Sequence, residues 1–232
     1  MQFLELFSDY WLAMLLAAVL AYALGSVNSA IIISGIAKKR DIRKYGSGNA
    51  GATNVMRTFG AGLGAVTFIC DVLKGAAAAG LSYLLAGILV PGGDGAWEVA
   101  YLGTLCGVLG HMFPVFFAFR GGKGVSTALG ALLVLDWRMA LCCLAVFIIA
   151  VILTRMVSVG SMAAAVSVPI FTFIFNRFVS ASPDRLTVCG TVLMAVMVLI
   201  VIIRHGENIK RIIKGTESRL SFGGGKTNKN TQ

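Results

Sequence analysis

Charged residues are scarce in this sequence: Lys, Arg, Asp and Glu together make up only 13% of its 232 residues. Soluble domains carry about a quarter charged residues. Apolar residues reach 57% and the mean hydropathy is +0.85, so there is too little polar material to cover a water-soluble globule. This excludes an ordinary cytosolic enzyme, and the apolar content excludes a disordered chain. The composition predicts a polytopic membrane protein.

The cysteines indicate neither a disulfide scaffold nor a metal site. All five lie in apolar runs, with no C-x-x-C spacing and no histidine nearby: Cys70, Cys106, Cys142, Cys143 and Cys189. Cysteines in such surroundings pack as small apolar side chains. The sequence therefore gives no metal or redox signal, and we expect no cofactor.

Long apolar runs predict an all-α fold with seven transmembrane helices, five long and two short. A spanning helix needs about 20 residues. The long runs are 11–37, 60–90, 99–119, 157–175 and 186–203, and the short ones are 125–135 and 139–154. The run 125–135 suits a half-helix or re-entrant element, and 139–154 returns the chain to the side it left. We expect a membrane-integral domain over residues 1–220 and a polar, disordered cytoplasmic tail over 221–232.

The basic residues are distributed unequally between the two sides of this topology. Most of the 20 Lys and Arg residues fall on one side, in the loop after the first run, in two later loops and in the tail. The positive-inside rule then places the N-terminus outside and the C-terminus in the cytoplasm. This asymmetry accounts for much of the net charge of +10 without a nucleic-acid partner, because the basic residues bracket helix ends.

The first of three polar clusters on the cytoplasmic side is residues 46–57. Glycines at spacings of two and three let successive backbone N–H groups turn toward an anion. The candidate ligands in this cluster are Ser47, Gly48, Asn49, Thr53, Asn54 and Arg57. A flexible Gly/Asn linker is the alternative interpretation.

The second cluster, residues 119–127, opens the short helix 125–135. A glycine-rich turn, a lysine and the free N–H groups of a helix N-terminus suit a phosphate. The candidates are Gly121, Gly122, Lys123, Gly124 and Thr127. The cluster is not a nucleotide P-loop, because Phe117 stands where that motif needs its first glycine.

The third cluster follows the last run. On a helix, His205, Asn208 and Arg211 share one face, and Glu217 follows shortly after. A basic juxtamembrane helix that contacts anionic lipid is the alternative interpretation.

Further polar residues lie deeper in the runs. Asp71 and Lys74 are three residues apart, and each unpaired charge there would cost about 2.5–3.5 kcal/mol. They fit a structural ion pair and a wall of the site equally well. Ser158 and Ser161 open a run on the cytoplasmic side, where helix capping explains only one of them. His111, just before a proline, fits a structural role better than a ligand.

In these motifs the sequence resembles the membrane-integral bacterial acyl-phosphate:glycerol-3-phosphate acyltransferase family. The segments that carry the resemblance are, in order, 46–57, 71–75, 110–127 and 205–217. The sequence departs from the family's usual residues at Ala50, Ser126 and Asn28, and none of these departures removes a candidate ligand. The resemblance covers nearly the whole chain up to about Leu220.

The resemblance implies transfer of a fatty acyl group from acyl phosphate to the sn-1 hydroxyl of glycerol 3-phosphate, giving lysophosphatidic acid and phosphate for phospholipid biosynthesis. It implies a multi-pass enzyme of the bacterial inner membrane with its active site facing the cytoplasm. The expected partners are glycerol 3-phosphate, membrane lipid and acyl phosphate supplied by a soluble acyl-phosphate-forming enzyme. We expect no nucleic-acid partner and a monomeric protein.

This chemistry requires positioning more than covalent activation, because acyl phosphate is already a mixed anhydride. The resemblance and the chemistry together suggest these catalytic residues: Arg57, Lys123, Ser161, His205 and Asn208. The remaining candidates would bind phosphate: Ser47, Gly48, Asn49, Thr53, Asn54, Gly121, Gly122, Gly124, Thr127, Ser158, Arg211 and Glu217. We expect the three clusters to converge on one site.

The sequence leaves alternatives for the proton acceptor and for the function. The hydroxyl proton could pass to His205 or to the substrate's own phosphate; we favour the phosphate, because a histidine beside cationic residues would more usefully donate to an anion. The alternative functions are a transporter of a phosphorylated metabolite and a structural lipid-binding anchor. The donors cluster at one face of the membrane, which disfavours a transporter, because a transporter's site is expected near the membrane midplane.

Overall fold

The computed structural model describes residues 2–90, 95–180, 182 and 184–220, and within these ranges every regular element is helical. The α-helices are α1 (Gln2–Ser26), α2 (Ser29–Lys38), α3 (Ala52–Phe59), α4 (Ala61–Leu89), α5 (Ala96–Met112), α6 (Val125–Leu135), α7 (Trp137–Thr154), α8 (Val157–Ile174), α9 (Asp184–Arg204) and α10 (Gly206–Ile213). Short 3₁₀ turns lie at Ile42–Lys44 (η1) and Val115–Phe117 (η2), and a π-helical turn lies at Phe175–Val179 (η3). The all-α prediction is confirmed. The predicted tail, 221–232, lies outside the described residues.

Six helical stretches in the described part of the chain are long and apolar enough to cross a membrane. They are Tyr10–Lys38, Ala61–Leu89, Ala96–Phe117, Trp137–Thr154, Val157–Val179 and Asp184–Arg204, with Val125–Leu135 as a shorter apolar helix. The helix predicted as short over 139–154 in fact begins at Trp137, because the Asp136 side chain accepts hydrogen bonds from the backbone N–H groups of Arg138 and Met139. The structure thus has six long stretches and one short one, instead of five and two.

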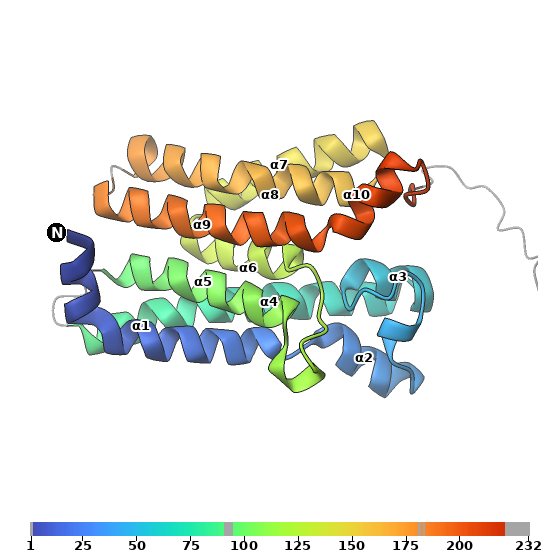
Figure 1. Cartoon of the computed structure of the whole chain (residues 1–232), viewed down its shortest axis with the longest axis horizontal. Helices are drawn as coiled ribbons and strands as arrows, with labels where there is room; N and C mark the ends of the chain where they lie inside the picture. Colours follow the sequence, from blue (N-terminus) through green and yellow to red (C-terminus); the bar gives the residue numbers. More distant parts are fainter. Residues whose placement is uncertain (1, 91–94, 181, 183, 221–232) are drawn as a thin grey trace, which may run out of the picture.

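The first predicted span is divided into two helices. α1 ends at Ser26 and α2 begins at Ser29, with Asn28 between them as the N-cap. The Asn28 side chain accepts a hydrogen bond of 3.1 Å from the backbone N–H of Ile31. This satisfies an N–H group that a new helix would otherwise leave unpaired. The break lets α2 diverge from the direction of α1 (Figure 1).

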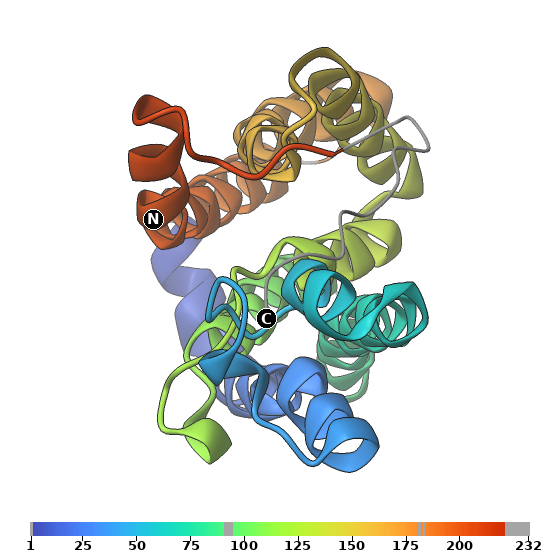
Figure 2. The same cartoon turned by 90° about the vertical axis from the view of Figure 1, so that its right-hand side faces the viewer.

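The long helices form two packed groups, seen end-on in Figure 2. In one group α1 packs against α4 and α5, and α4 packs against α6. In the other, α8 packs between α7 and α9. The groups meet mainly where α5 contacts α9 and α6 contacts α7.

Glycines allow a close contact between α4 and α6. A Cβ atom on Gly75 would lie 1.9 Å from the Thr127 carbonyl oxygen, and one on Gly130 would lie 1.8 Å from that of Val72. Small residues let helix backbones approach in this way inside membranes. The contact fixes the start of α6, where the second polar cluster ends.

The polar clusters lie at the end of the bundle where α2, α3 and α10 are found, on the right of Figure 1, while α1 begins at the opposite end. Large apolar side chains such as Ile88 and Leu153, 80% and 78% exposed, cover the outside of the helices. An apolar exterior of this extent suits lipid and not water. Which end faces the cytoplasm stays a prediction from the charge distribution.

Candidate functional site

One cavity of about 230 Å³ lies between the three polar clusters. Its polar lining comes from the first cluster (Ser47, Asn49, Thr53, Asn54, Arg57), the second (Lys123, Gly124), the third (His205, Asn208, Arg211, Glu217) and from His111, Ser158 and Ser161. Segments far apart in the sequence are therefore brought together, as the sequence analysis expected. Within the part of the chain that the structure describes, no group of three His, Cys, Asp or Glu side chains could hold a metal ion.

The loop before α3 has a fixed shape, which Asn54 imposes. The side-chain oxygen of this buried residue accepts a 2.9 Å hydrogen bond from the Ser47 N–H, and its amide donates to the carbonyls of Tyr45 (2.9 Å) and Asn49 (3.0 Å). These contacts favour an ordered site over the flexible linker. They also engage Asn54 internally, so it organises the loop more than it offers donors to a ligand.

Arg57 has a different environment at the mouth of the same cavity. Its side chain is exposed, and no hydrogen bond or ion pair joins it to the other described residues. A guanidinium with no partner at a cavity rim is suited to bind an anion in a bidentate manner.

Gly121 and Gly122 lie outside the cavity lining, unlike Gly124. Their N–H groups donate to the carbonyls of Met112 (3.2 Å) and His111 (3.1 Å) at the end of α5. A Cβ on Gly122 would lie 2.1 Å from His111 Nε2, so only glycine fits there. Both residues thus hold the turn against α5, and their N–H groups are not free for a phosphate.

Two other predicted ligands also lie outside the lining. The Gly48 N–H donates to the Tyr45 carbonyl at 3.0 Å, and φ at Gly48 is +72°, which favours glycine. Thr127 is fully buried, with its carbonyl against Gly75. Neither residue faces the cavity, so the geometry gives them packing roles.

A hydrogen-bonded chain connects the second and third clusters. The Lys123 ammonium donates to the side-chain oxygen of Asn208, whose amide donates to Glu217 Oε1 at 2.7 Å. Arg211 Nε donates to the other carboxylate oxygen, Oε2, at 2.7 Å. Glu217 therefore orients Asn208 and Arg211. Its negative charge would repel a phosphate, so it acts on the site through these two residues.

Burial lowers the pKa of Lys123 and His205, which lie at the centre of the site. It lowers the pKa of Lys123 to about 8, and the nearby positive charge of Arg211 contributes to this decrease. Burial also lowers the pKa of His205 to about 4, so its imidazole is neutral at neutral pH. His205 Nδ1 lies 2.8 Å from the Val201 carbonyl oxygen, which can only accept, so Nδ1 carries the hydrogen and Nε2 the lone pair.

Glu217 stays ionised in its buried position. Burial alone would raise the pKa of its carboxyl group, but the neighbouring Ser158 hydroxyl, the hydrogen bonds from Asn208 and Arg211 and the positive charge of Arg211 outweigh burial and lower it. The contacts of Glu217 with the third cluster therefore persist through the neutral range.

A buried polar group lies behind the cavity. Asp71 Oδ1 is 2.9 Å from Lys74 Nζ and 3.6 Å from His111 Nδ1, and Lys74 also donates to the Val27 carbonyl at 2.9 Å. Asp71 and Lys74 do not line the cavity, which favours the structural ion pair, whereas His111 does line it. Ser126 also lines the cavity, with its hydroxyl 3.5 Å from Asp71 Oδ2. Ser126 is a cavity residue that was not predicted from the sequence.

The cavity continues from its polar end between the helices. This part is lined by apolar side chains from α6 to α9: Leu129, Leu132, Leu144, Phe147, Ala165, Val168 and Met197. Sequence reasoning missed them, because residues of the same types also face outward along these helices. The arrangement joins a cationic compartment to an apolar one and can hold an amphiphilic molecule.

Comparisons with known proteins agree on one family. A family model described as "Glycerol-3-phosphate acyltransferase" matches residues 15–215. The chain is 41% identical over 203 residues to the glycerol-3-phosphate acyltransferase of Shewanella halifaxensis, covering 87% of this chain and 92% of that protein. It is 39% identical over 206 residues to the one of Clostridioides difficile, covering 89% and 95%.

Solved structures give the same result. The crystal structure of PlsY (YgiH), an integral membrane glycerol 3-phosphate acyltransferase, in its glycerol 3-phosphate form matches with a TM-score of 0.74 and 37% identity, covering 90% of this chain and 96% of that one. Its lysophosphatidic acid form matches with a TM-score of 0.71 and 36% identity, over 90% and 95%.

Proposed function

Since the chain belongs to the glycerol-3-phosphate acyltransferase family, we propose that it transfers a fatty acyl group from acyl phosphate to the sn-1 hydroxyl of glycerol 3-phosphate. The products would be lysophosphatidic acid and inorganic phosphate, for phospholipid biosynthesis. One observation carries the proposal: a single cavity joins a donor-lined cationic compartment to an apolar one. An acyl phosphate needs both compartments, one for its head and one for its chain.

Both reactants carry a phosphate, and the polar compartment has cations for both. Arg57, Lys123 and Arg211 line it, together with hydroxyls such as Ser47 and Ser161. Each charge-assisted hydrogen bond contributes about 1.5–3 kcal/mol, so a few of them would hold two anionic groups side by side. The free N–H groups at the start of α6 would add to this attraction.

The reaction would proceed by direct transfer. The sn-1 hydroxyl oxygen forms a bond to the acyl carbonyl carbon, the bond from that carbon to the phosphate oxygen breaks, and phosphate leaves. The hydroxyl proton passes to the phosphate of glycerol 3-phosphate. The low pKa of His205, about 4, supports the phosphate over the imidazole as proton acceptor. Lys123 and Asn208 would stabilise the charge that develops in the transition state.

We further propose that the polar end of the cavity faces the cytoplasm of a bacterial cell and that the protein acts as a monomer. Three basic residues at this end, Lys38, Lys39 and Lys44, are exposed, which supports the orientation. A soluble enzyme would deliver acyl phosphate from the same side.

The test uses purified protein, palmitoyl phosphate and labelled glycerol 3-phosphate, with palmitoyl-CoA as the alternative donor. We expect labelled lysophosphatidic acid with the acyl phosphate alone. Arg57→Met should reduce the rate, while Lys210→Met, on an exposed side of α10, should not. If liposomes with the protein instead take up label unchanged and no lysophosphatidic acid forms, the protein is a carrier and the proposal is wrong.

A further inference from the structure

The ligands of the proposed site are divided between the two groups of helices (Figure 2). The loop before α3 and the turn with Lys123 belong to the group of α1–α6, whereas Ser161, His205 and Asn208 belong to the group of α7–α10. A contact at the site between the groups would therefore determine how accurately these ligands face one another.

Arg204 makes such a contact. It is the last residue of α9, directly before His205, and its Nη2 lies 3.2 Å from the Gly121 carbonyl oxygen and 3.3 Å from that of Gly122. Its guanidinium carbon lies 5.3 Å from the centroid of the Phe113 ring, a cation–π distance. Arg204 thus reaches from α9 to the turn that leads into Lys123.

The turn is held from two directions. Its glycine N–H groups donate to carbonyls of α5, and its glycine carbonyls accept from Arg204. With both sets of backbone groups engaged, the turn has little freedom to move. The position of Lys123, the next residue, then follows from α5 on one side and α9 on the other.

The charge of Arg204 has no acidic partner among the described residues, and its buried Nε lacks a hydrogen-bond partner there. Burying a cation in an apolar bundle is costly, and no ion pair in the described part of the chain offsets this cost for Arg204. Its presence therefore needs another explanation. A planar guanidinium can both stack on an aromatic ring and donate to two neighbouring carbonyls, which an ammonium group cannot do as well.

We infer that Arg204 is a positioning residue that fixes the Gly121–Gly122 turn to α9 and thereby places the Lys123 ammonium against Asn208 and the substrate phosphates. This inference rests on the proposed acyl transfer for its kinetic consequence. Arg204 itself does not line the cavity, so it acts through Lys123.

A double-mutant cycle tests the inference. Arg204→Met, Lys123→Met and the double variant are purified, and kcat and KM are measured for each. We expect Arg204→Met to lower kcat by on the order of 10²-fold, since a displacement of about 1 Å has effects of this size. The double variant should be no slower than Lys123→Met alone, because the two residues act through one group. Arg204→Lys should recover part of kcat.

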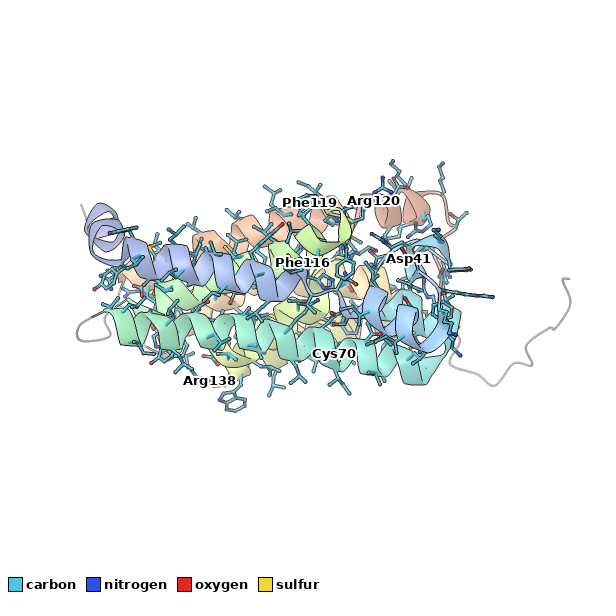
Figure 3. The ribbon with its side chains drawn as sticks, turned by 90° about the horizontal axis from the view of Figure 1, so that it is seen from below. Asp41, Cys70, Phe116, Phe119, Arg120 and Arg138 are labelled. Carbon is cyan, nitrogen blue, oxygen red and sulfur yellow. The ribbon has the colours of Figure 1, made fainter. Side chains whose placement is uncertain are left out.

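Arg120→Met is the matched control. Arg120 carries the same charge on the same turn but lies exposed on its outer side (Figure 3), and this variant should keep the wild-type rate. Thermal melting in detergent separates folding from positioning. The inference is wrong if Arg204→Met lowers only the melting temperature and leaves kcat per folded protein unchanged. It is also wrong if the decreases in kcat of the two single variants multiply in the double variant.

A second measurement does not depend on acyl transfer. The pH midpoint for labelling Lys123 with an amine reagent reports its environment, which is set by the charged or titratable groups Arg57, Arg204, His205, Arg211 and Glu217. Arg204→Met should shift this midpoint upward, because Lys123 becomes more solvated and loses a neighbouring cation, while Arg120→Met should not. An unchanged midpoint overturns the inference. A wild-type protein without acyl transfer overturns only the proposed function.

Discussion

The ammonium group of Lys123 donates a hydrogen bond to the side-chain oxygen of Asn208, 85 residues further along the chain. The partner is a neutral amide, and within the described residues no carboxylate pairs directly with Lys123. The Asn208 amide is in turn held by Glu217. Asn208 therefore orients the Lys123 ammonium without neutralising its charge, so the charge remains available to bind an anionic substrate.

The first prediction concerns pH. Lys123 has a pKa of about 8, so the charged form is present below that pH and is lost as the pH rises through it. We expect kcat/KM to fall above about pH 8, because this ratio reports ionisations of the free enzyme. Lys123→Arg should keep its charge and abolish this decrease. Initial rates of wild type and variant from about pH 6 to pH 10 provide the measurement. An alkaline decrease that persists unchanged in Lys123→Arg would assign it to another group.

The second prediction concerns Asn208. Replacing it with leucine removes the acceptor for Lys123 and leaves an oxygen of the buried Glu217 without its hydrogen bond. We expect a rate decrease on the order of 10²-fold, comparable to the loss of a transition-state donor. The control is Glu207→Gln on the same helix, whose ion pair with Lys210 is exposed and contributes little. Equal rates for the two variants would remove Asn208 from the mechanism.

The third prediction concerns His205. Because its pKa is already about 4, the imidazole is a weak base. Its Nδ1–H is held by the Val201 carbonyl, so Nε2 can contribute only by accepting a hydrogen bond, and the donation to an anion expected from the sequence is wrong. His205→Gln should therefore retain measurable turnover, and His205→Ala should retain less. Turnover with acyl phosphate and the binding of both substrates are measured for each variant. Complete loss of turnover in His205→Gln with normal binding would identify His205 as the base.

The convergence of the three clusters could be predicted from the sequence because polar residues are rare in this chain. In an apolar sequence, segments such as 46–57 stand out, and the run lengths place them on one side. Their internal hydrogen bonds could not be predicted. The N–H groups of Gly121 and Gly122 are engaged by α5, and the Asn54 amide by its own loop, through packing that spacing does not reveal.

Two other features of the structure were outside the reach of sequence patterns. The apolar compartment is lined by residues such as Leu132 and Phe147, which are of the same types as those facing outward, so composition does not distinguish them. The start of α7 at Trp137 depends on the Asp136 cap. Hydropathy predicted a start at residue 139, because it does not detect a helix that begins in a polar segment.

The fourth prediction concerns the buried pair behind the site. Asp71→Leu alone leaves Lys74 without its carboxylate in an apolar environment, and such a loss costs about 3–5 kcal/mol. Adding Lys74→Met removes the unpaired charge, so the double variant should be more stable than the single one. Thermal melting of the purified variants measures this order. If the double variant melts at a lower temperature than Asp71→Leu, the ion-pair explanation is wrong.

The fifth prediction concerns the contact that fixes the start of α6. Gly75→Ala would place a methyl group 1.9 Å from the Thr127 carbonyl oxygen, which belongs to backbone and cannot rotate away. The two helices would have to separate, and overpacking of this kind costs about 1–3 kcal/mol. On the same helix, Gly87 has nothing within 4 Å of its Cβ position, so Gly87→Ala should be neutral or stabilise by up to about 1 kcal/mol through helix propensity. Melting temperatures in detergent should therefore move in opposite directions, or fall only for Gly75→Ala. Gly124, the N-cap of α6, and Ser126 in its first turn line the cavity, so Gly75→Ala should also lower the rate at temperatures where the variant is folded. Equal melting temperatures and equal rates for the two variants would show that the helices can separate without cost.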